Sequence, residues 1–543
     1  MKKIVAVAAA AVAVAAGAAV APTVLAAPET KPSQVAYDPA PIAWGKCGSP
    51  VLARRGAQCG FLEVPLDYAR SDGPKIKLAV SRIKAKVPAE QYQGVMVTNP
   101  GGPGGSGVML SVLGEFVPKK AGLAYDWIGF DPRGVGASQP ALTCAADHFG
   151  YNRPPYVPFT RELERTWLAR AEKYAAACDA AGGDLLDHAK TTDTVNDVDV
   201  LRKALGQEQI NYYGFSYGTY LGQVYSTVYP ERVRRMVLDG NIDARKVWYQ
   251  ANLDQDIAFD RNIKIYFDWI AKHDAVYHLG TDGEDIERLF YAEQKRLTKE
   301  PAGGVIGPDE FTDIFLQAGY YVFGWTDVAS AFSAWVNEGD SAGLKKLYDD
   351  VYAQGPGSDN SYAMYLATQC TDVQWPTKWS RWRADNWRTF LRAPFETWGN
   401  AWFNAPCLTW GAAAGKPVEV DGSKAPAILL ISETLDAATP YAGSLATRDR
   451  FPKAALIEGV GGTTHSGSLN GVACVDDQIA DYLATGKLPA RKPGRGSDGQ
   501  CDPVPQPDPA APGSAQQRTA ATDSGSGDLT RADLQRIIVG GRR

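Results

Sequence analysis

The chain has 543 residues, 45% apolar and 22% charged, a composition typical of a globular protein and too apolar for a disordered one. Its 56 Lys and Arg residues and 61 Asp and Glu residues give a formal net charge of −5, so no excess positive charge is available for a phosphate backbone. We therefore expect no nucleic-acid partner and look for chemistry on small molecules or peptides.

The first 26 residues are typical of a secretory signal peptide. Two lysines precede an Ala/Val-rich run, and the small residues Val24 and Ala26 mark a cleavage site. The alternative is a transmembrane anchor, but Ala is only weakly apolar and Pro22 interrupts the run. We predict export to the extracellular space, with no stable membrane association.

Eight cysteines follow this segment, and an even number in an exported chain favours disulfides. Spacing alone leaves about 105 pairings open. We predict pairs of sequence neighbours: Cys47 with Cys59, Cys144 with Cys178, Cys370 with Cys407, and Cys474 with Cys501. A zinc site is the competing interpretation, but the sequence has no Cys-x-x-Cys motif and no His beside a Cys.

Apolar runs bounded by turn residues predict a mostly parallel β-sheet. Residues 61–66 and 75–83 alternate apolar and polar residues, as half-buried strands do. Five further runs are continuously apolar, which is typical of strands covered on both faces. These runs lie at residues 94–99, 127–131, 210–214, 233–239 and 427–432. Helical patterns such as residues 191–205 lie between them, so the predicted fold class is α/β.

Residues 241–424 lack clear strand runs and contain 11 of the 14 Trp residues. We predict a mostly helical cap inserted over the sheet, because strand patterns resume after it; a separate domain with a Trp-rich core is the alternative. The predicted organisation is a signal peptide (1–26), a first core part (27–240), the cap (241–424), a second core part (425–503) and a tail (504–543). The tail is rich in Pro, Gly, Ser and Ala, which predicts disorder apart from one short helix at 529–539.

The sequence Gly214-Phe215-Ser216-Tyr217-Gly218 matches the Gly-x-Ser-x-Gly pattern of a nucleophile elbow. It follows a predicted strand and opens a predicted helix, the context that lifts a serine hydroxyl above the sheet over a helix N-terminus. The pentapeptide alone occurs by chance, so its flanking elements carry the prediction of Ser216 as a nucleophile.

A serine hydroxyl needs a base, and in α/β hydrolases the order along the chain is serine, acid, histidine. Of the five histidines, His465 alone follows the serine in a glycine-flanked loop after an apolar run; two others precede the serine and two lie on predicted cap helices. Asp436 follows the preceding strand and is the predicted acid, with Glu433 as the second candidate. Asp436 as a simple helix cap remains an alternative.

A tetrahedral intermediate needs two backbone N–H donors. One is expected from Tyr217, directly after the serine, and the other from the glycine-rich loop at residues 99–107, which follows a buried strand. A phosphate-binding loop is the other interpretation, but the Gly-Lys-Ser/Thr ending is missing.

With these residues placed, the chain resembles the α/β-hydrolase serine peptidases related to proline iminopeptidases, and more narrowly the secreted tripeptidyl aminopeptidases of actinomycetes. The resemblance runs from about Cys47 to Cys501 and is most distinctive in the glycine loop and around Trp248. It implies release of tripeptides from free N-termini through an acyl-enzyme, without metal or other cofactor. It also implies Ser216, Asp436 and His465 as the triad and Gly102 with Tyr217 as oxyanion donors.

An aminopeptidase must also bind an ammonium group, and a buried cation needs a carboxylate partner. Candidates in the cap are Asp254, Asp256, Asp260 and Glu396, although solvation at the surface is the simpler interpretation for each. The Trp residues could line an apolar trough for the substrate or simply form the core of the cap. We expect a monomer that acts on peptides with a free N-terminus.

Three other functions remain open. A carboxylesterase or lipase would use the same triad, because function is not fixed by the fold. A carboxypeptidase would need Arg or Lys in place of the acidic cap residues. A binding protein derived from an inactive hydrolase is disfavoured because all the triad residue types are present.

Overall fold

The computed structural model describes residues 36–352, 355–509, 530, 531, 534, 535 and 538. The predicted signal peptide and the tail from 510 to 529 lie outside the described residues. Among the helices within the described ranges, none has the length and apolar character needed to cross a membrane.

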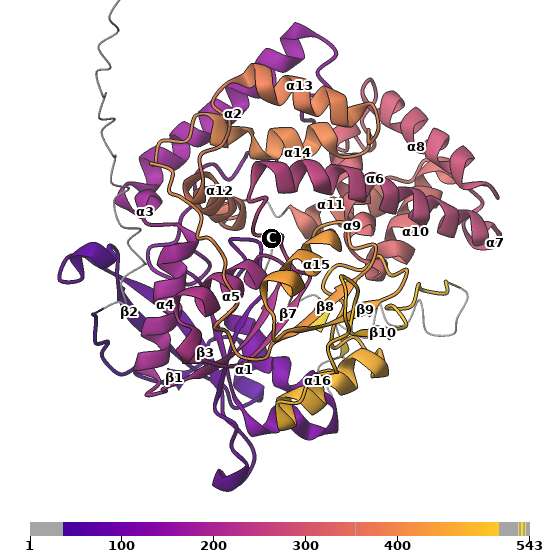
Figure 1. Cartoon of the computed structure of the whole chain (residues 1–543). Coiled ribbons are helices and arrows are strands. Elements are labelled where there is room, and N and C mark those ends of the chain that lie inside the picture. The colour runs from indigo at the N-terminus through magenta and orange to yellow at the C-terminus, as the bar shows by residue number, and fades with distance from the viewer. Residues whose placement is uncertain (1–35, 353–354, 510–529, 532–533, 536–537, 539–543) are drawn as a thin grey trace, which may run out of the picture. The chain divides into compact units, whose positions relative to one another are not determined.

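The described strands form one ten-stranded sheet in the order β1-β2-β3-β5-β4-β6-β7-β8-β9-β10 (Figure 1). Pairing is antiparallel from β1 to β2, β2 to β3 and β3 to β5, and parallel across the rest of the sheet. The strands are β1 (Gly45–Lys46), β2 (Gln58–Pro65), β3 (Lys75–Ile83), β4 (Val95–Asn99), β5 (Asp126–Phe130), β6 (Ile210–Phe215), β7 (Val233–Asp239), β8 (Leu429–Glu433), β9 (Ala455–Gly459) and β10 (Gly499–Cys501). The prediction of a mostly parallel sheet is confirmed.

The central strands are buried on both faces, which explains their continuous apolar runs. Alternate residues of one strand enter two different cores: Tyr212 packs with α4 and α5, whereas Tyr213 packs with α16. The helices outside the cap are α1 (Pro50–Arg54), α2 (Arg161–Gly182), α3 (Asp184–Asp187), α4 (Thr191–Ala204), α5 (Tyr217–Val228), α15 (Ala442–Arg450) and α16 (Ala473–Thr485).

The segment between β7 and β8 is helical, and its helices group on one side of the strands in Figure 1. They are α6 (Tyr249–Lys272), α7 (Asp274–Tyr277), α8 (Gly283–Leu297), α9 (Pro308–Tyr320), α10 (Trp325–Glu338), α11 (Ala342–Val351), α12 (Asn360–Asp372), α13 (Trp379–Phe390) and α14 (Thr397–Asn404). Most Trp side chains of this segment are buried in packed clusters, Trp269 and Trp325 among the cap helices and Trp398 with Trp402 against α2. These tryptophans therefore serve as core residues.

Four disulfides join the neighbouring cysteines: Cys47–Cys59, Cys144–Cys178, Cys370–Cys407 and Cys474–Cys501. Residues 504–509, which composition predicts to begin a disordered tail, are held against the fold. The Val504 N–H donates to the Glu433 carboxylate at 2.7 Å, and the Pro507 carbonyl accepts from the Trp269 indole at 3.0 Å. Composition misses this attachment because it depends on partners far away in the sequence.

Candidate active site

Ser216 lies at the turn between β6 and α5, with φ 55° and ψ −124°. This conformation is strained for a non-glycine residue and is the one a nucleophile elbow requires. The turn is tight because Gly214 packs against the following helix: a Cβ at Gly214 would collide with the carbonyl oxygen of Gly218. A Cβ at Gly218 would likewise lie 2.8 Å from the Asn99 carbonyl oxygen, so the glycines on both sides of the serine allow the close packing of this turn.

His465 and Asp436 form a buried pair on the loops that follow β9 and β8. The Asp436 carboxylate lies 2.8 Å from Nδ1 of the imidazole, and both side chains are 1% exposed. Thr439 completes the contact: its hydroxyl donates to the same carboxylate at 2.8 Å and lies 3.2 Å from Nδ1. The carboxylate orients the ring so that its other nitrogen, Nε2, points away from Asp436.

The serine turn and the histidine loop meet at the end of β7. The Asp239 carbonyl accepts from the Ser216 N–H at 2.9 Å and from the Ser466 hydroxyl at 3.3 Å. At Gly240, the next residue, a Cβ would lie 3.1 Å from Cε1 of His465. These contacts bring residues more than 200 positions apart to the same edge of the sheet.

The end of cap helix α9 covers the imidazole. The His465 N–H donates to the Tyr320 carbonyl at 2.9 Å, and the ring centroids of Tyr320 and Tyr321 lie 5.9 and 6.2 Å from that of His465. Cap and core therefore both contribute to the position of the histidine.

Glu433, the second candidate for the acid, has a different place. Its carboxylate accepts from the N–H groups of Thr464 at 2.6 Å and Val504 at 2.7 Å, so it holds the backbone of the histidine loop rather than the imidazole. Burial raises its pKa to about 8. The geometry favours Asp436 as the partner of His465.

The glycine loop after β4 passes directly over the nucleophile elbow. A Cβ at Gly101 would lie 2.8 Å from Cβ of Ser216 and 3.0 Å from the Tyr217 nitrogen, so Gly102 and Tyr217 belong to adjoining backbone segments. Asn99 fixes the start of the loop by accepting from the Gly101 N–H at 3.0 Å. Two backbone amides can converge here on one oxygen.

Asp131, which follows β5, fixes the other end of the glycine loop. One carboxylate oxygen accepts from the Ser106 hydroxyl at 2.6 Å and the N–H groups of Gly107 and Val108 at 3.0 and 3.1 Å, and the other accepts from the Ala137 N–H at 2.8 Å. Burial raises the pKa of this carboxyl, and these donors oppose that shift. The sequence does not reveal this role of Asp131, because three of its four partners come from the glycine loop after another strand.

The four acidic candidates of the cap divide into two pairs. Asp254 is partly exposed and binds Lys246 at 2.5 Å, and Asp260 binds Lys264 at 2.7 Å. Each of these carboxylates already has a cation.

The other pair, Asp256 and Glu396, is buried where α6 meets the start of α14. Asp256 accepts from the Asn400 side chain at 2.7 Å; burial raises its pKa to about 8, the Asn400 hydrogen bond opposes this shift, and Asp254 adds to it. Burial and the nearby Asp313 raise the pKa of Glu396 well above its usual value. Within the described residues, Oε2 of Glu396 is buried without a hydrogen-bond partner.

A chain of polar side chains connects this pair with the glycine loop. The Asn400 side chain donates to Asp256 and accepts from the Asn404 amide at 2.9 Å. The side-chain oxygen of Asn404 in turn accepts from the Tyr365 hydroxyl at 2.9 Å. The backbone nitrogen of Tyr365 would lie 2.9 Å from a Cβ at Gly104. The buried acidic pair is thus on the side of the cap that faces the loops of the site.

A serine on a strained strand–helix turn, with a glycine loop packed over it and a buried His–Asp pair on a loop that meets it at the end of β7, defines a serine hydrolase of the α/β-hydrolase fold. Comparison with known families agrees: the description "alpha/beta hydrolase fold" matches residues 94–277, and "TAP-like protein" matches residues 393–501. The chain belongs to this α/β-hydrolase family of serine peptidases, which includes the tripeptidyl aminopeptidases.

Three relatives illustrate the range of the family. The tripeptidyl aminopeptidase of Streptomyces lividans is 38% identical over 483 residues, covering 86% of this chain and 88% of the relative. Serine protease Hip1 of Mycobacterium tuberculosis H37Rv is 30% identical over 481 residues, covering 83% and 90%. Carboxylesterase B of the same organism is 30% identical over 456 residues, covering 80% and 85%. The prediction of an α/β-hydrolase peptidase is confirmed.

Three polar residues of the site were not predicted from the sequence: Thr439, Asp239 and Asp131. Thr439 has a local signal, because it stands three residues after the acid in a turn, the spacing at which a hydroxyl can reach back to a carboxylate. The other two are identifiable only by contacts between distant strands.

Proposed function

We propose that this protein is a secreted exopeptidase that removes tripeptides from the free N-terminus of peptides through an acyl-enzyme. The observation that carries the exopeptidase assignment is the buried acidic pair, Asp256 and Glu396, which has no directly bound cation among the described residues. In this proposal the acidic pair selects substrates with a free N-terminus, and the serine, histidine and aspartate cleave the peptide bond.

In the proposed reaction, His465 removes the proton from the Ser216 hydroxyl as its oxygen attacks the scissile carbonyl. Asp436 keeps the imidazole in the tautomer with its proton on Nδ1 and stabilises the imidazolium that forms. The amides of Gly102 and Tyr217 bind the negative oxygen of the tetrahedral intermediate. His465 then protonates the departing amine, and water releases the tripeptide by the same steps.

The substrate's ammonium group would bind between Asp256 and Glu396. A buried carboxylate is strongly destabilised without a partner, which is why both hold their protons more tightly than usual. A cation entering this place offsets the desolvation of both groups. A peptide with an acylated N-terminus has no positive charge at that end, so it gains no binding energy from Asp256 and Glu396.

Secretion is supported by the four disulfides and by the signal-peptide pattern of the N-terminal sequence. An oxidising compartment is where such a set of disulfides forms and persists.

The test compares three chromogenic substrates: a tripeptide p-nitroanilide with a free N-terminus, the same tripeptide N-acetylated, and p-nitrophenyl acetate. We expect the free tripeptide to be cleaved with a kcat/KM at least about 10-fold above the acetylated one, since a lost buried ion pair is a matter of about 1.4 kcal/mol or more. Equal rates on both peptides would contradict the exopeptidase mode, and cleavage of the ester alone would favour a carboxylesterase.

A matched pair of variants locates the ammonium site. Asp256→Asn should raise KM for the free tripeptide about 10-fold or more and leave hydrolysis of the ester unchanged. Asp254→Asn, two residues earlier and already paired with Lys246, is the control: it should leave ester hydrolysis unchanged and should not raise KM, because it only removes a neighbouring negative charge that raises the pKa of Asp256. An equal effect of both substitutions would contradict the assignment.

A further inference from the structure

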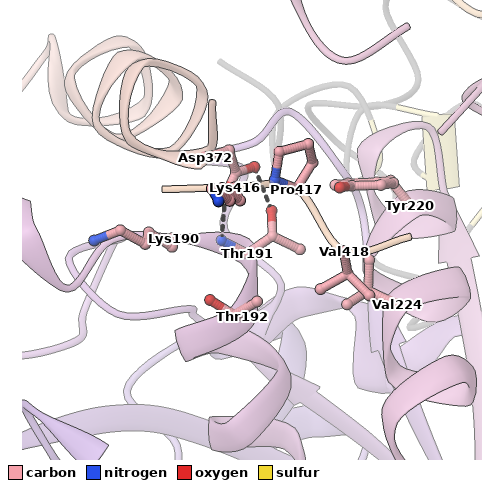
Figure 2. A pocket seen from close by; sticks show the side chains of 9 residues that line it. All are labelled: Lys190, Thr191, Thr192, Tyr220, Val224, Asp372, Lys416, Pro417 and Val418. Atoms are coloured by element: carbon pink, nitrogen blue, oxygen red, sulfur yellow. Dashed lines mark hydrogen bonds between the residues drawn. The ribbon is translucent and has the colours of Figure 1, made fainter. Parts of the chain in front are cut away.

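The side chain of Tyr217 lies in a buried hydrogen-bonded chain that the peptidase reaction does not itself require. Its hydroxyl is 2.8 Å from the Thr191 hydroxyl at the start of α4. The Thr191 hydroxyl donates to the Asp372 carboxylate at 2.6 Å, and the Thr191 N–H donates to the other oxygen at 2.6 Å. Figure 2 shows Thr191 pointing at Asp372, with both hydrogen bonds drawn.

The direction of this chain follows from proton counting. A hydroxyl has one proton to donate, and that of Thr191 goes to Asp372. The contact between Tyr217 and Thr191 must therefore be a donation by the phenol. The chain runs from Tyr217 through Thr191 to the carboxylate, each member fixing the orientation of the one before it.

Asp372 is the last residue of cap helix α12, and its carboxylate also accepts a hydrogen bond from Trp248 at the start of the cap. The Trp248 indole, directly before α6, donates to the Asp372 carboxylate at 3.1 Å and packs against the rings of Tyr217 and Tyr220 at centroid distances of 5.9 and 5.1 Å. Asp372, Thr191, Trp248 and Tyr217 are all at most 5% exposed. Burial raises the pKa of Asp372 to about 6, and its three donors oppose that shift.

The other end of α12 touches the second half of the oxyanion site. Gly104 has φ +90°, and a Cβ there would collide with the carbonyl oxygen of Ser361, in the first turn of α12. The glycine loop is thus in direct contact with one end of this helix, while Tyr217 is connected to its other end.

We propose that cap helix α12 braces both backbone donors of the oxyanion hole, contacting the glycine loop through its first turn and fixing Tyr217 through Thr191 and the positioning residue Asp372. The proposal rests on the assignment of Gly102 and Tyr217 as oxyanion donors. Asp372 does not reach the reacting atoms; it acts by holding the first residue of α5, whose N–H would bind the oxyanion. The cap would then serve the chemical step as well as the binding of substrate.

The experiment uses p-nitrophenyl acetate, which needs the nucleophile and the oxyanion hole but neither a peptide nor an ammonium site. A failure of the tripeptidyl aminopeptidase assignment would therefore leave this test intact. Titration of reactive serine with a fluorophosphonate counts the folded sites, so kcat is expressed per active enzyme and a loss of folded protein does not register as a loss of catalysis.

Thr191→Val and Tyr217→Phe each remove one hydroxyl of the chain while keeping side-chain volume and the backbone amide. We expect each to lower kcat per titrated site about 10-fold with KM within about 2-fold, since small misplacements of an oxyanion donor are costly. The double variant should be no slower than the slower single variant, because both break the same chain. Asp372→Asn should lower kcat at least as much, because one Asp372 oxygen accepts from the Thr191 N–H and the other from the Thr191 hydroxyl and the Trp248 indole, and an amide keeps only one of these two acceptor oxygens.

Tyr225→Phe is the matched control, because Tyr225 is also a buried phenol on α5 whose hydroxyl contacts a carboxylate, that of Asp199 at 3.4 Å. It should leave kcat per titrated site within about 2-fold of the unmodified enzyme. Unchanged kcat in both Thr191→Val and Tyr217→Phe would overturn the proposal, as would an equal loss in Tyr225→Phe. These two variants decide the matter even if Asp372→Asn does not fold.

Discussion

At the scale of single residues, burial gives chemically identical carboxylates different tasks. Asp436 is buried against an imidazole and a hydroxyl, so it has the partners needed to orient a base. Asp256 and Glu396 are buried, no cation among the described residues forms an ion pair with either of them, and burial raises the pKa of both so that they hold protons more tightly. The difference lies in the neighbours and not in the residue type.

A pH dependence follows for Asp256, whose pKa is raised to about 8 by burial. A carboxyl with a pKa of about 8 is almost fully protonated at pH 6 and about half ionised at pH 8, so an arriving ammonium meets a carboxylate far more often at pH 8 than at pH 6. We therefore predict that KM for a free tripeptide p-nitroanilide falls as pH rises from 6 to 8. Above about pH 8 the peptide's own amino group loses its proton and KM should rise again.

The control for this prediction is Asp256→Asn, which should flatten the dependence of KM on pH, while kcat/KM for p-nitrophenyl acetate corrects for titration of the catalytic base. An identical slope of KM with pH in Asp256→Asn and in the unmodified enzyme would contradict the role of Asp256.

The same raised pKa has a consequence for stability. The folded state holds a proton that the unfolded state loses near pH 4, so this group lowers the free energy of unfolding as pH rises from about 4 to 8.

Much of the candidate site could be predicted at this scale, because the order serine, acid, histidine and the flanking turn residues are local patterns. The structure brings His465 and Asp436 into contact and places Ser216 at the strained turn, while their catalytic roles stay predictions until tested. Asp131 and Asp239 could not be predicted, because their importance comes from donors on distant loops.

At the scale of helices and strands, the buried ion pair between Arg133 and Asp197 connects α4 with the ends of β2 and α3. Arg133, 1% exposed, binds both oxygens of Asp197 on α4 at 2.6 and 2.8 Å. Its remaining N–H groups donate to the carbonyls of Pro65 and Leu66 at the end of β2 and of His188 after α3. The pair therefore joins the antiparallel side of the sheet to the helix that covers it.

Asp197→Asn should lower the free energy of unfolding by about 3–5 kcal/mol, because it leaves a buried guanidinium without its counter-charge. Denaturant unfolding measures this change, and kcat per titrated serine should stay the same since neither residue touches the site. Asp350→Asn, which breaks an exposed pair with Lys346, is the comparison and should cost at most about 1 kcal/mol. A similar loss of unfolding free energy in the two variants would show that the buried pair stabilises the fold no more than the exposed pair does.

The central strands could be predicted from the sequence because they are buried on both faces and therefore uniformly apolar. The edge strands β1 and β10, two and three residues long, were not predicted because so short a segment has no periodicity. The 3₁₀ segment Val108–Phe116 was missed for another reason: its apolar residues have no strand or α-helix period, and tertiary packing under the sheet decides its conformation.

At the scale of the whole described molecule, the cap and the core share the site. The core supplies Ser216 and the loops of Asp436 and His465, whereas the cap covers the imidazole at Tyr320 and provides the acidic pair. The sequence indicates an insertion at this point but not which cap residues face the loops, because that depends on helix packing over more than 150 residues. Under the proposed function, this shared construction would give a hydrolase core its preference for one end of the peptide.

The central claim is that Ser216 is the nucleophile activated by His465, and covalent labelling tests it most directly. The enzyme is treated with a fluorophosphonate and the modified peptide is identified by mass spectrometry. We predict a single adduct on Ser216, its loss in His465→Gln, and a fall of kcat on the order of 10⁴-fold or more in a folded Ser216→Ala variant. An adduct on another residue, or Ser216→Ala that still hydrolyses the ester at the original rate, would contradict the account.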